Sequence, residues 1–130
     1  MKVKVTPSKV HGNVKIPASK SMAHRALICA SLSDGTSLVS NVTNSKDIEA
    51  TVGCMKALGA IIKQIDETTY EVTGTNLFKQ EGNITCNANE SGSTLRFLIP
   101  LAACTNAKVK FLGQGRLLQR PMDVYANEFK

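Results

Sequence analysis

Hydrophobic and polar residues follow two periods along the chain, and these periods predict an alternation of helices and short strands. Apolar residues at helical spacing predict helices over residues 19–32, 45–58 and 91–104, and Pro121 suits the first turn of a fourth helix that runs to Lys130. The runs that resemble strands lie at residues 3–5, 10–16, 36–42, 60–65, 69–73, 83–86 and 108–112. This order predicts an α/β fold.

The helix candidates carry recognisable stripes and end signals. The apolar stripe of the first helix consists of Met22, Ala23, Ala26, Leu27 and Ala30. Ser19 is a suitable N-cap for this helix, and Asn44 or Ser45 for the second, which ends before Gly59. Pro100 lies inside the third helix, where a proline costs about 3 kcal/mol or kinks the helix.

The second half of the chain partly repeats the first. A shift of 71 residues places Arg25-Ala26-Leu27-Ile28 on Arg96-Phe97-Leu98-Ile99, and it places Leu38 on Val109. The predicted elements agree with one unit of two helices and several strands, followed by part of a second copy. The last helical pattern reaches Lys130 without a C-cap signal, so we expect the chain to be a piece of a longer protein.

The composition limits the class of protein. The chain has 130 residues, of which 42% are apolar, with 9 glycines and 4 prolines. These values fit one modest domain and exclude collagen and low-complexity disorder. The longest apolar run, residues 97–104, is far shorter than the ~20 residues of a membrane helix, and the N-terminus lacks a signal-peptide pattern. We therefore expect a cytoplasmic protein with no membrane partner.

The spacing of the cysteines argues against a metal site. A zinc site needs close pairs of ligands, and this chain has no such pair. The cysteines are Cys29, Cys54, Cys86 and Cys104. Because free cysteine packs like a small hydrophobic residue, we expect buried free thiols, as suits a reducing compartment.

The formal net charge of +6 points to an anionic partner. The chain has no tryptophan, only 2 tyrosines and 4 phenylalanines, and its basic residues are dispersed. The stacking platform of a nucleic-acid-binding protein is therefore missing. Small anionic ligands explain the charge equally well, because they need only a few well-placed cations.

Two segments place cations and small residues at the start of a predicted helix, where free N–H groups and the helix dipole favour an anion. The first contains Lys20 and Ser21, with Arg25 one turn later on the same face. The second contains Gly92, which lets a ligand approach the backbone, and Arg96 one turn later. From spacing alone, capped helices with solvated cations remain an alternative for both segments.

The spacing alone leaves open the roles of four further residues. Arg116 and Arg120, four residues apart, can reach one anion or remain solvated. Asp47, in the first turn of the second helix, is typical of a favourable contact with the helix dipole. His24 is a lone histidine, which we expect at the surface rather than in the role of a base.

Together these segments resemble the enolpyruvyl transferases, most closely the 5-enolpyruvylshikimate-3-phosphate synthases. The matching segments come in family order and span nearly the whole chain. They are Ile16-Pro17-Ala18-Ser19-Lys20-Ser21 with Arg25-Ala26-Leu27, Asp34-Gly35-Thr36 with Asn41, Ser91-Gly92-Ser93-Thr94-Leu95-Arg96, and Arg116 with Gln119-Arg120-Pro121-Met122. The sister family that uses a UDP-sugar carries Lys-Asn in place of Lys20-Ser21, and is the poorer match.

The resemblance implies a fold and a reaction. The implied fold has repeated β-α-β-α-β-β units packed around buried helices, and residues 1–130 would form part of the N-terminal substrate-binding domain of a two-domain enzyme. In the implied reaction the enolpyruvyl group of phosphoenolpyruvate moves to the 5-hydroxyl of shikimate 3-phosphate, and phosphate leaves. No metal and no organic cofactor is implied.

The resemblance also implies roles for individual residues. Lys20 would touch both substrates, and Ser21 and Arg25 would hold the phosphate of shikimate 3-phosphate. Gly92 and Arg120 would line the phosphoenolpyruvate site. Two more residues match motif positions without an assigned contact, namely Arg96 and Asp47.

The chain departs from the family pattern in two ways. Glu90 stands where the family often has asparagine, and it would repel an anion unless Arg96 or Arg120 pairs with it. The family's acid and base carboxylates belong to a second domain, so we expect this piece to be inactive alone, with that C-terminal domain as its partner. The alternatives are a UDP-sugar enolpyruvyl transferase, a non-enzymatic anion-binding module, and a domain that binds RNA or processes RNA 3′-phosphates.

Overall fold

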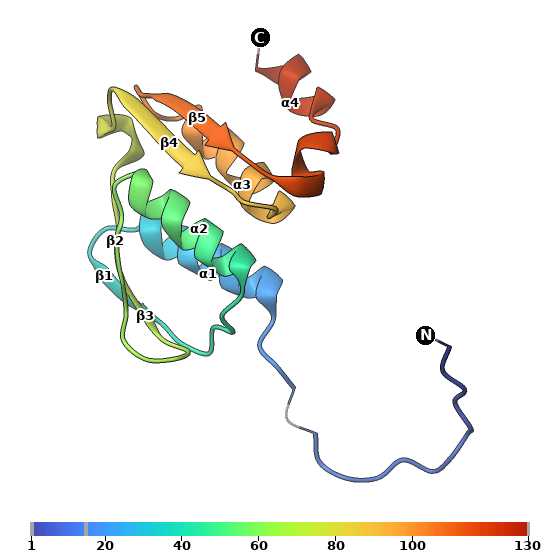
Figure 1. The fold of residues 1–130 in the computed structure, drawn as a ribbon. Helices are drawn as coiled ribbons and strands as arrows, with labels where there is room; N and C mark the ends of the chain where they lie inside the picture. Colours follow the sequence, from blue (N-terminus) through green and yellow to red (C-terminus); the bar gives the residue numbers. More distant parts are fainter. Residues whose placement is uncertain (1, 15, 130) are drawn as a thin grey trace.

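The computed structural model of the chain describes residues 2–14 and 16–129. Helices and strands alternate along it, which confirms the predicted α/β class (Figure 1). The elements are α1 (Lys20–Leu32), β1 (Thr36–Val39), α2 (Lys46–Ala57), β2 (Ile61–Gln64), β3 (Tyr70–Thr73), η1 (Leu77–Lys79), β4 (Asn83–Asn87), α3 (Gly92–Ala102), β5 (Lys108–Leu112), η2 (Gly115–Gln119) and α4 (Asp123–Glu128).

A serine caps each of the three long helices. The side chains of Ser19, Ser45 and Ser91 each accept a hydrogen bond from the backbone N–H three residues further on. Such a bond satisfies one of the free donors in the first turn of a helix. The structure confirms Ser19 as a cap and selects Ser45 over Asn44. Gly59 follows α2 with φ of 100°, the left-handed conformation that glycine adopts at low cost.

The strands form two separate sheets. In the first sheet β3 lies between β1 and β2 and pairs antiparallel with both, and β2 and β3 form the predicted hairpin. In the second sheet β4 and β5 pair in parallel, with α3 as the crossover between them. The parallel pairing places the C-terminal ends of β4 and β5 at the same edge, where the loops that follow them lie together.

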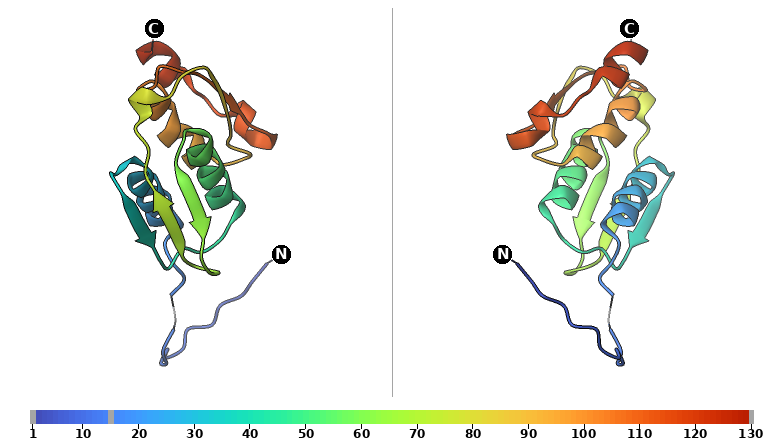
Figure 2. Two further views of the ribbon diagram at one scale, coloured as in Figure 1. Left: turned by 90° about the vertical axis from the view of Figure 1, so that its left-hand side faces the viewer. Right: turned by 90° about the vertical axis from the view of Figure 1, so that its right-hand side faces the viewer.

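Helices α1 and α2 fill the space between the two sheets (Figures 1 and 2). Helix α1 packs on β1 and β3, while α2 packs on α1, β2, β4 and α3. The largest apolar side chains that are fully buried in this core are Leu27, Val42, Ile48, Met55, Leu58, Val72 and Leu98. The core therefore joins the helices to both sheets and fixes the helix ends relative to one another.

The two strands expected near the N-terminus are absent from the part of the chain that the structure describes. Residues 2–14 form no strand, and they extend away from the folded body in Figure 1. The side chains of Val3, Val5, Val10 and Val14 are all more than 70% exposed. Alternation of apolar residues produces a strand only where a neighbouring strand takes up the hydrogen bonds. The part of this expectation that falls on residue 15 lies outside the described residues.

The buried face of α1 is rotated from the predicted one. Met22 is 63% exposed and Ala26 is exposed, whereas Leu27 and Ile28 are both buried against the core. Burial of these two large side chains outweighs burial of an alanine, because the gain grows with apolar area. The rotation also turns His24, the residue one turn before Ile28, into the core.

Pro100 neither ends nor interrupts α3, which continues to Ala102. A proline lacks the N–H that would bond to the carbonyl four residues earlier, which here belongs to Arg96. The hydroxyl of Tyr125 donates a hydrogen bond of 3.1 Å to that carbonyl. The residue that makes this contact belongs to α4, so the proline creates an attachment point between the two helices.

The last helix starts later than predicted. Residues 115–119 form the short 3-10 helix η2, and α4 begins at Asp123 rather than at Pro121. Leu117 is 3% exposed, and its burial draws the preceding loop toward the core. The chain is extended at Arg120, which separates the two helical segments. Lys130, the expected end of this helix, lies outside the described residues.

The four thiols divide into two kinds. All are free, but only Cys54 and Cys86 are buried, so the expectation of burial is wrong for Cys29 and Cys104. Cys29 is on the solvent side of α1, and Cys104 follows the end of α3. A hydrogen bond from the Cys86 thiol, at 3.8 Å from the Cys54 carbonyl, ties α2 to β4. Contact with Cys86, together with burial, raises the pKa of Cys54.

No helix within residues 2–14 and 16–129 is long and apolar enough to cross a membrane. Over the same residues no three histidine, cysteine or carboxylate side chains group in a way that could hold a metal ion. The predicted internal repeat has structural counterparts: α1 and α3 begin at corresponding positions, as do β1 and β5.

Candidate functional site

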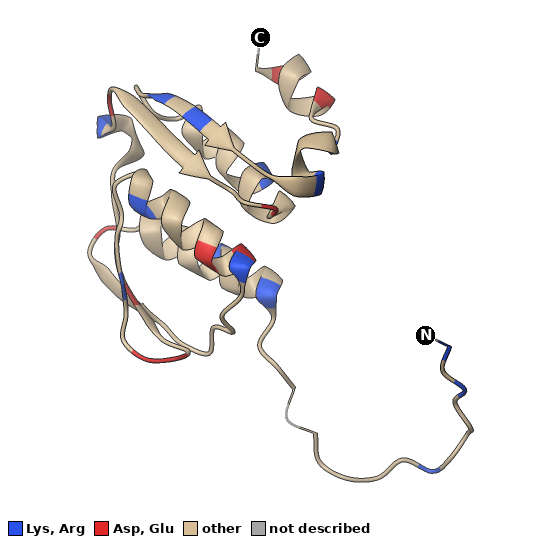
Figure 3. Ribbon diagram, in the orientation of Figure 1, with Lys and Arg blue, Asp and Glu red and all other residues tan. Residues whose placement is uncertain are grey.

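The N-terminal ends of α1, α2 and α3 lie on the same side of the molecule (Figure 1). Lys20 opens α1, Lys46 and Asp47 open α2, and Gly92 opens α3. Figure 3 shows that lysine, arginine and acidic residues gather around these ends. Because the first turn of each helix presents unpaired N–H groups and the positive end of a dipole, the three ends together favour an anion. We call these three first turns the helix-start cluster.

An ion pair joins the first two helices of this cluster. Lys20 Nζ lies 2.6 Å from Asp47 Oδ2, with 54% and 33% of the two side chains exposed. A pair so open to solvent stabilises the fold by roughly 0–1 kcal/mol. The contact therefore positions Lys20 beside α2 and leaves its side chain open to solvent.

Arg25 connects α1 to α3. Its Nη1 donates a hydrogen bond of 2.8 Å to the backbone carbonyl of Ser21, one turn earlier. Its guanidinium carbon lies 4.9 Å from the centre of the Phe97 ring on α3, a cation–π contact. Both contacts orient the guanidinium, while Arg25 and Ser21 remain exposed. The structure thus leaves Ser21 and Arg25 accessible at the start of α1.

Arg120 lies directly over the first residue of α3. A side chain at Gly92 would collide with the Arg120 guanidinium, so only glycine permits this approach. The loops that carry the two residues are tied by a hydrogen bond of 2.8 Å from Gln114 N–H to the Asn89 carbonyl. Asn89 itself adopts φ of 49°, which turns the chain sharply before α3. The arrangement brings together the two residues expected at the phosphoenolpyruvate site.

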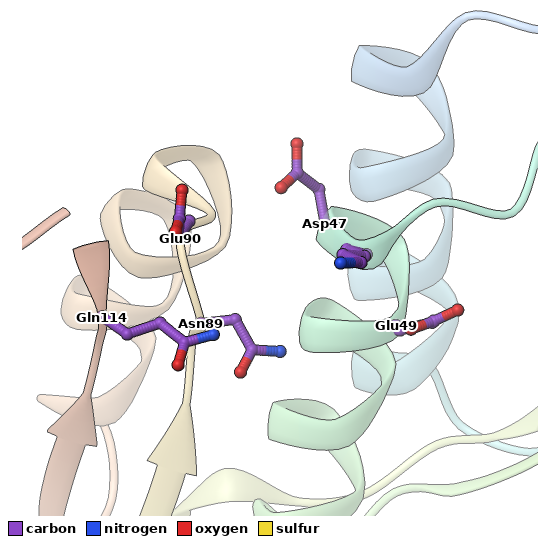
Figure 4. Close-up of a pocket in the computed structure, with 6 residues that line it drawn as sticks. Asp47, Glu49, Asn89, Glu90 and Gln114 are labelled. Carbon is purple, nitrogen blue, oxygen red and sulfur yellow. The ribbon is translucent and has the colours of Figure 1, made fainter. Parts of the chain in front are cut away.

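A pocket of about 500 Å³ opens between α2 and the loops after β4 and β5. Its lining residues are Lys46, Asp47, Glu49, Asn89, Glu90 and Gln114. In Figure 4, Asp47 lies on one wall and Glu90 and Asn89 on the other, while Glu49 points away from the gap. Asp47 and Glu90 therefore place carboxylates on opposite walls of the pocket, beside the cations of the helix-start cluster.

Glu90 is not paired with either arginine that was expected to neutralise it. Within the described ranges the ion pairs are Lys20–Asp47 and Lys63–Glu71. The Glu90 carboxylate instead lies against Gly115, whose φ of 56° and missing side chain make room for it.

Arg96 lies apart from the Lys20–Asp47 pair. It lines a separate hollow with Pro121, Asp123, Val124 and Tyr125, on the side of α3 that faces α4. Arg116 and Arg120 also do not share a helical face, because a 3-10 helix has three residues per turn and η2 ends before Arg120. Of the expected site residues, the structure thus joins Lys20 with Asp47, Ser21 with Arg25, and Gly92 with Arg120.

Sequence reasoning missed His24. The expectation of a surface residue is wrong, because the side chain is 0% exposed and its Nδ1 lies 2.7 Å from Thr51 Oγ1 on α2. Burial lowers the pKa of His24, against the nearby Asp47 carboxylate, which raises it. The imidazole is therefore neutral near pH 7. The available signal was its helical spacing from Leu27, Ile28 and Ser31, which are all buried.

Taken together, the helix-start cluster and the arginines beside it can bind anionic groups. Lys20, Arg25 and Arg120 supply cations, and the first turns of the helices supply backbone donors. Asp47 and Glu90 beside them can accept hydrogen bonds from hydroxyl groups. The site suits a small ligand that carries both phosphate or carboxylate groups and hydroxyls.

The chain is similar in sequence to a known protein family. The family model described as EPSP synthase (3-phosphoshikimate 1-carboxyvinyltransferase) matches residues 4–130. The 3-phosphoshikimate 1-carboxyvinyltransferase of Clostridium perfringens (strain 13 / Type A) is 50% identical over 129 residues, which are 99% of this chain and 30% of the relative. That of Clostridium kluyveri is 49% identical over 128 residues, 98% of this chain and 30% of the relative.

The fold is also similar to that of a solved structure. The EPSP synthase from Acinetobacter baumannii superimposes with a TM-score of 0.74 and 21% identity, over 89% of this chain and 27% of the solved one. At this identity the likeness concerns the fold alone. The chain spans about 30% of the length of the curated relatives it matches.

Proposed function

The chain belongs to the EPSP synthase (3-phosphoshikimate 1-carboxyvinyltransferase) family, and we propose that it forms part of the N-terminal, substrate-binding domain of such an enzyme. The whole enzyme would transfer the enolpyruvyl group of phosphoenolpyruvate to the 5-hydroxyl of shikimate 3-phosphate and release phosphate. The relatives' names favour this reaction over one that uses a UDP-sugar. No metal or organic cofactor takes part in the proposed reaction.

One observation carries this proposal: a series of contacts connects Lys20, on α1, to the start of α3. Lys20 pairs with Asp47 at 2.6 Å, and the Asp47 carbonyl oxygen lies 3.3 Å from the Thr94 hydroxyl. Thr94 lies in the first turn of α3, which begins at Gly92 under the Arg120 guanidinium. A series of contacts therefore links Lys20 to Arg120, which lie 100 positions apart in the sequence.

The proposed roles follow from this placement. Ser21 and Arg25 hold the phosphate of shikimate 3-phosphate, because the hydroxyl and the guanidinium fork lie exposed on one turn of α1. Gly92 and Arg120 bind phosphoenolpyruvate, and Lys20 reaches both ligands. As the reaction proceeds, charge moves onto the departing phosphate, and the cations Lys20 and Arg120 stabilise it.

The proposed reaction also needs proton transfers. Asp47 and Glu90 are carboxylates on opposite walls of the pocket, and Asp47 is already paired with Lys20. We assign the acid and base to a second domain outside these 130 residues, so this chain alone binds substrate without turning it over. Arg96 faces α4, and we propose no direct contact between it and either substrate.

Titration of shikimate 3-phosphate into the ¹⁵N-labelled chain tests the proposal. We expect saturable amide shifts in the first turn of α1, from Lys20 to Arg25, and loss of saturation in Arg25→Ala. Arg116→Ala is the matched control, because it removes an exposed arginine outside the helix-start cluster. A folded spectrum that the ligand does not perturb contradicts the proposed half-site.

The same chain distinguishes the remaining alternatives. A binding module for RNA would bind short oligonucleotides with an affinity that falls steeply as salt rises. A general anion-binding module would bind sulfate and shikimate 3-phosphate equally well. The proposed function requires that shikimate 3-phosphate bind more tightly than sulfate, because its hydroxyls add contacts to the carboxylates of the pocket.

A further inference from the structure

A chain of buried polar groups runs beneath the helix-start cluster. His24 Nδ1 on α1 lies 2.7 Å from the Thr51 hydroxyl on α2, which lies 2.7 Å from the Thr94 hydroxyl on α3. The Thr94 hydroxyl in turn lies 2.7 Å from the hydroxyl of Ser91, the N-cap of α3. None of the four residues is more than 2% exposed. Three short hydrogen bonds thus link all three long helices.

The hydrogen bonds between these four side chains all point in one direction, from donor to acceptor. Each hydroxyl has one proton to donate, and Thr94 donates its proton to Ser91. The Thr94 oxygen must then accept from Thr51, and Thr51 must accept from His24. The carbonyl of Asp47 lies 3.3 Å from both threonine hydroxyls, so it competes weakly with partners at 2.7 Å. Since His24 must donate to Thr51, the proton of its neutral ring is on Nδ1.

The direction of these hydrogen bonds determines the role of Ser91, the last residue of the series. Ser91 Oγ accepts from the hydroxyl of Thr94 and from its backbone N–H, at 2.7 and 3.2 Å. Its own proton is not used within the chain. Ser91 adjoins Gly92, over which Arg120 lies. The orientation set at His24 on α1 is therefore passed to the first turn of α3.

We propose that His24 is a positioning residue that holds the starts of α1, α2 and α3 in register through Thr51 and Thr94, and so sets the geometry of the anion site. This inference rests on the proposed function for its ligand. His24 does not touch the substrate in this role, since it acts through the two threonines. The distance from Lys20, on α1, to Gly92, on α3, depends on these links.

The surroundings of His24 keep the imidazole neutral. Helix α1 contributes the charges of Lys20 and Arg25, and α2 contributes the carboxylate of Asp47. Helix α3 contributes the hydroxyl chain. The second ring nitrogen, Nε2, is buried without a partner among the residues described. A charged ring would need a partner there, so the neutral donor at Nδ1 is the form that the site accommodates.

Variants of His24 separate hydrogen bonding from packing. Asparagine places an amide N–H where Nδ1–H stands, and so can donate to Thr51, whereas phenylalanine fills the same space without a donor. Thr51→Val breaks the chain in its middle with little change of shape, should the His24 variants fold poorly. Ser31→Ala is the matched control, because it removes a buried hydroxyl at the far end of α1, one that bonds only within its own helix.

The first measurement needs no ligand. Ring ¹⁵N shifts of His24 in the 130-residue chain report the tautomer, and we expect the Nδ1–H form. In His24→Phe and Thr51→Val we expect altered amide shifts and faster hydrogen exchange at Gly92, Ser93 and Thr94, on a different helix. We expect His24→Asn to restore the wild-type values, and Ser31→Ala to leave them unchanged.

The second measurement is the affinity for shikimate 3-phosphate. We expect His24→Phe and Thr51→Val to weaken binding about tenfold, and His24→Asn to stay within about threefold of wild type. Folded His24→Phe and Thr51→Val variants with unchanged α3 amides and affinity overturn the positioning role. A wild-type chain that does not bind the ligand overturns the proposed function instead, while the ligand-free measurement still decides whether His24 holds α3 in register.

Discussion

Gly92 and Arg120 meet at the first turn of α3, and their contact leaves no room for a side chain at position 92. In Gly92→Ala the new methyl group displaces the guanidinium. We expect the affinity for phosphoenolpyruvate to fall about tenfold, because a hydrogen bond to a charged group contributes about 1.5–3 kcal/mol. Isothermal titration of the folded variant checks this result.

Gly53→Ala is the control for that substitution. Gly53 lies within α2, and a methyl group there meets no atom within 4 Å. We expect Gly53→Ala to raise the free energy of unfolding by about 0.5–1 kcal/mol, since alanine favours a helix, and to leave the affinity unchanged. Equal affinities in Gly92→Ala and Gly53→Ala would refute the proposed role of the Gly92–Arg120 contact.

Asp47 neutralises part of the charge that an anion would meet. In Asp47→Asn the Lys20 ammonium loses its partner at 2.6 Å, and we expect the affinity for inorganic phosphate to rise by up to about fivefold. Glu67→Gln makes the same change of net charge at an exposed residue in the turn between β2 and β3, which does not line the pocket. A similar gain in both variants would mean that net charge, rather than the Lys20 pair, controls binding. Phosphate titration followed by NMR provides the measurement.

Sequence patterns named the residues of the candidate site, but not their relations in space. Lys20, Ser21 and Arg25 follow from one helix start, and Gly92 from another, because local signals mark such starts. The position of Arg96 does not follow, because the rotation of α3 in the core turns this arginine toward α4. The burial of His24 was missed for the same reason, since the rotation of α1 depends on which large side chains pack on α2.

At the scale of elements, Pro100 and Tyr125 together connect α3 to α4. The proline leaves the Arg96 carbonyl free, and Tyr125 donates to it at 3.1 Å. We expect Tyr125→Phe to lower the free energy of unfolding by about 0.5–1.5 kcal/mol and to speed hydrogen exchange in α4. In the Pro100→Ala background the new N–H takes the carbonyl, so the same substitution should have little effect. A double-mutant cycle by urea denaturation measures this coupling, and additive effects would contradict it.

The elements themselves were predictable where local signals suffice. Serine caps, apolar stripes and Gly59 defined α1, α2 and α3, and the hairpin of β2 and β3 follows from two alternating runs with a polar turn between them. The N-terminal strands were not predictable, because a strand depends on a neighbour that no local pattern specifies. The start of α4 was misplaced because Leu117 packs into the core, a long-range contact.

At the scale of the whole molecule, His24 couples folding to pH. Burial lowers its pKa in the folded state, whereas the unfolded chain keeps a value near about 6.5. Below that pH the unfolded state takes up a proton first, so the stability contributed by neutral His24 is full above about pH 6.5 and falls as the pH drops toward the folded pKa. We expect the free energy of unfolding to decrease from pH 7.5 to 5.5 in urea titrations.

The two histidines of the chain provide the comparison for this prediction. His11 lies exposed in the extended N-terminal segment, and His11→Asn is the matched control for the loss of a histidine. His24→Asn should flatten the pH dependence, because the amide does not titrate. A wild-type curve that is already flat over this interval would contradict a neutral, buried His24. Carboxylates contribute mainly near about pH 4, below the interval tested.

The four thiols can report unfolding, because two of them are exposed and two are buried. Cys29 and Cys104 are exposed, so a maleimide dye should attach to both within the native protein. Cys54 and Cys86 are enclosed by the core and react only when it opens. Mass spectrometry should therefore find two labels added rapidly, and two more added at the rate at which the core unfolds. This measurement needs no engineered cysteine. The same exposed pair would cross-link molecules in air, and samples kept without a reductant should accumulate covalent dimers whose interiors remain reduced.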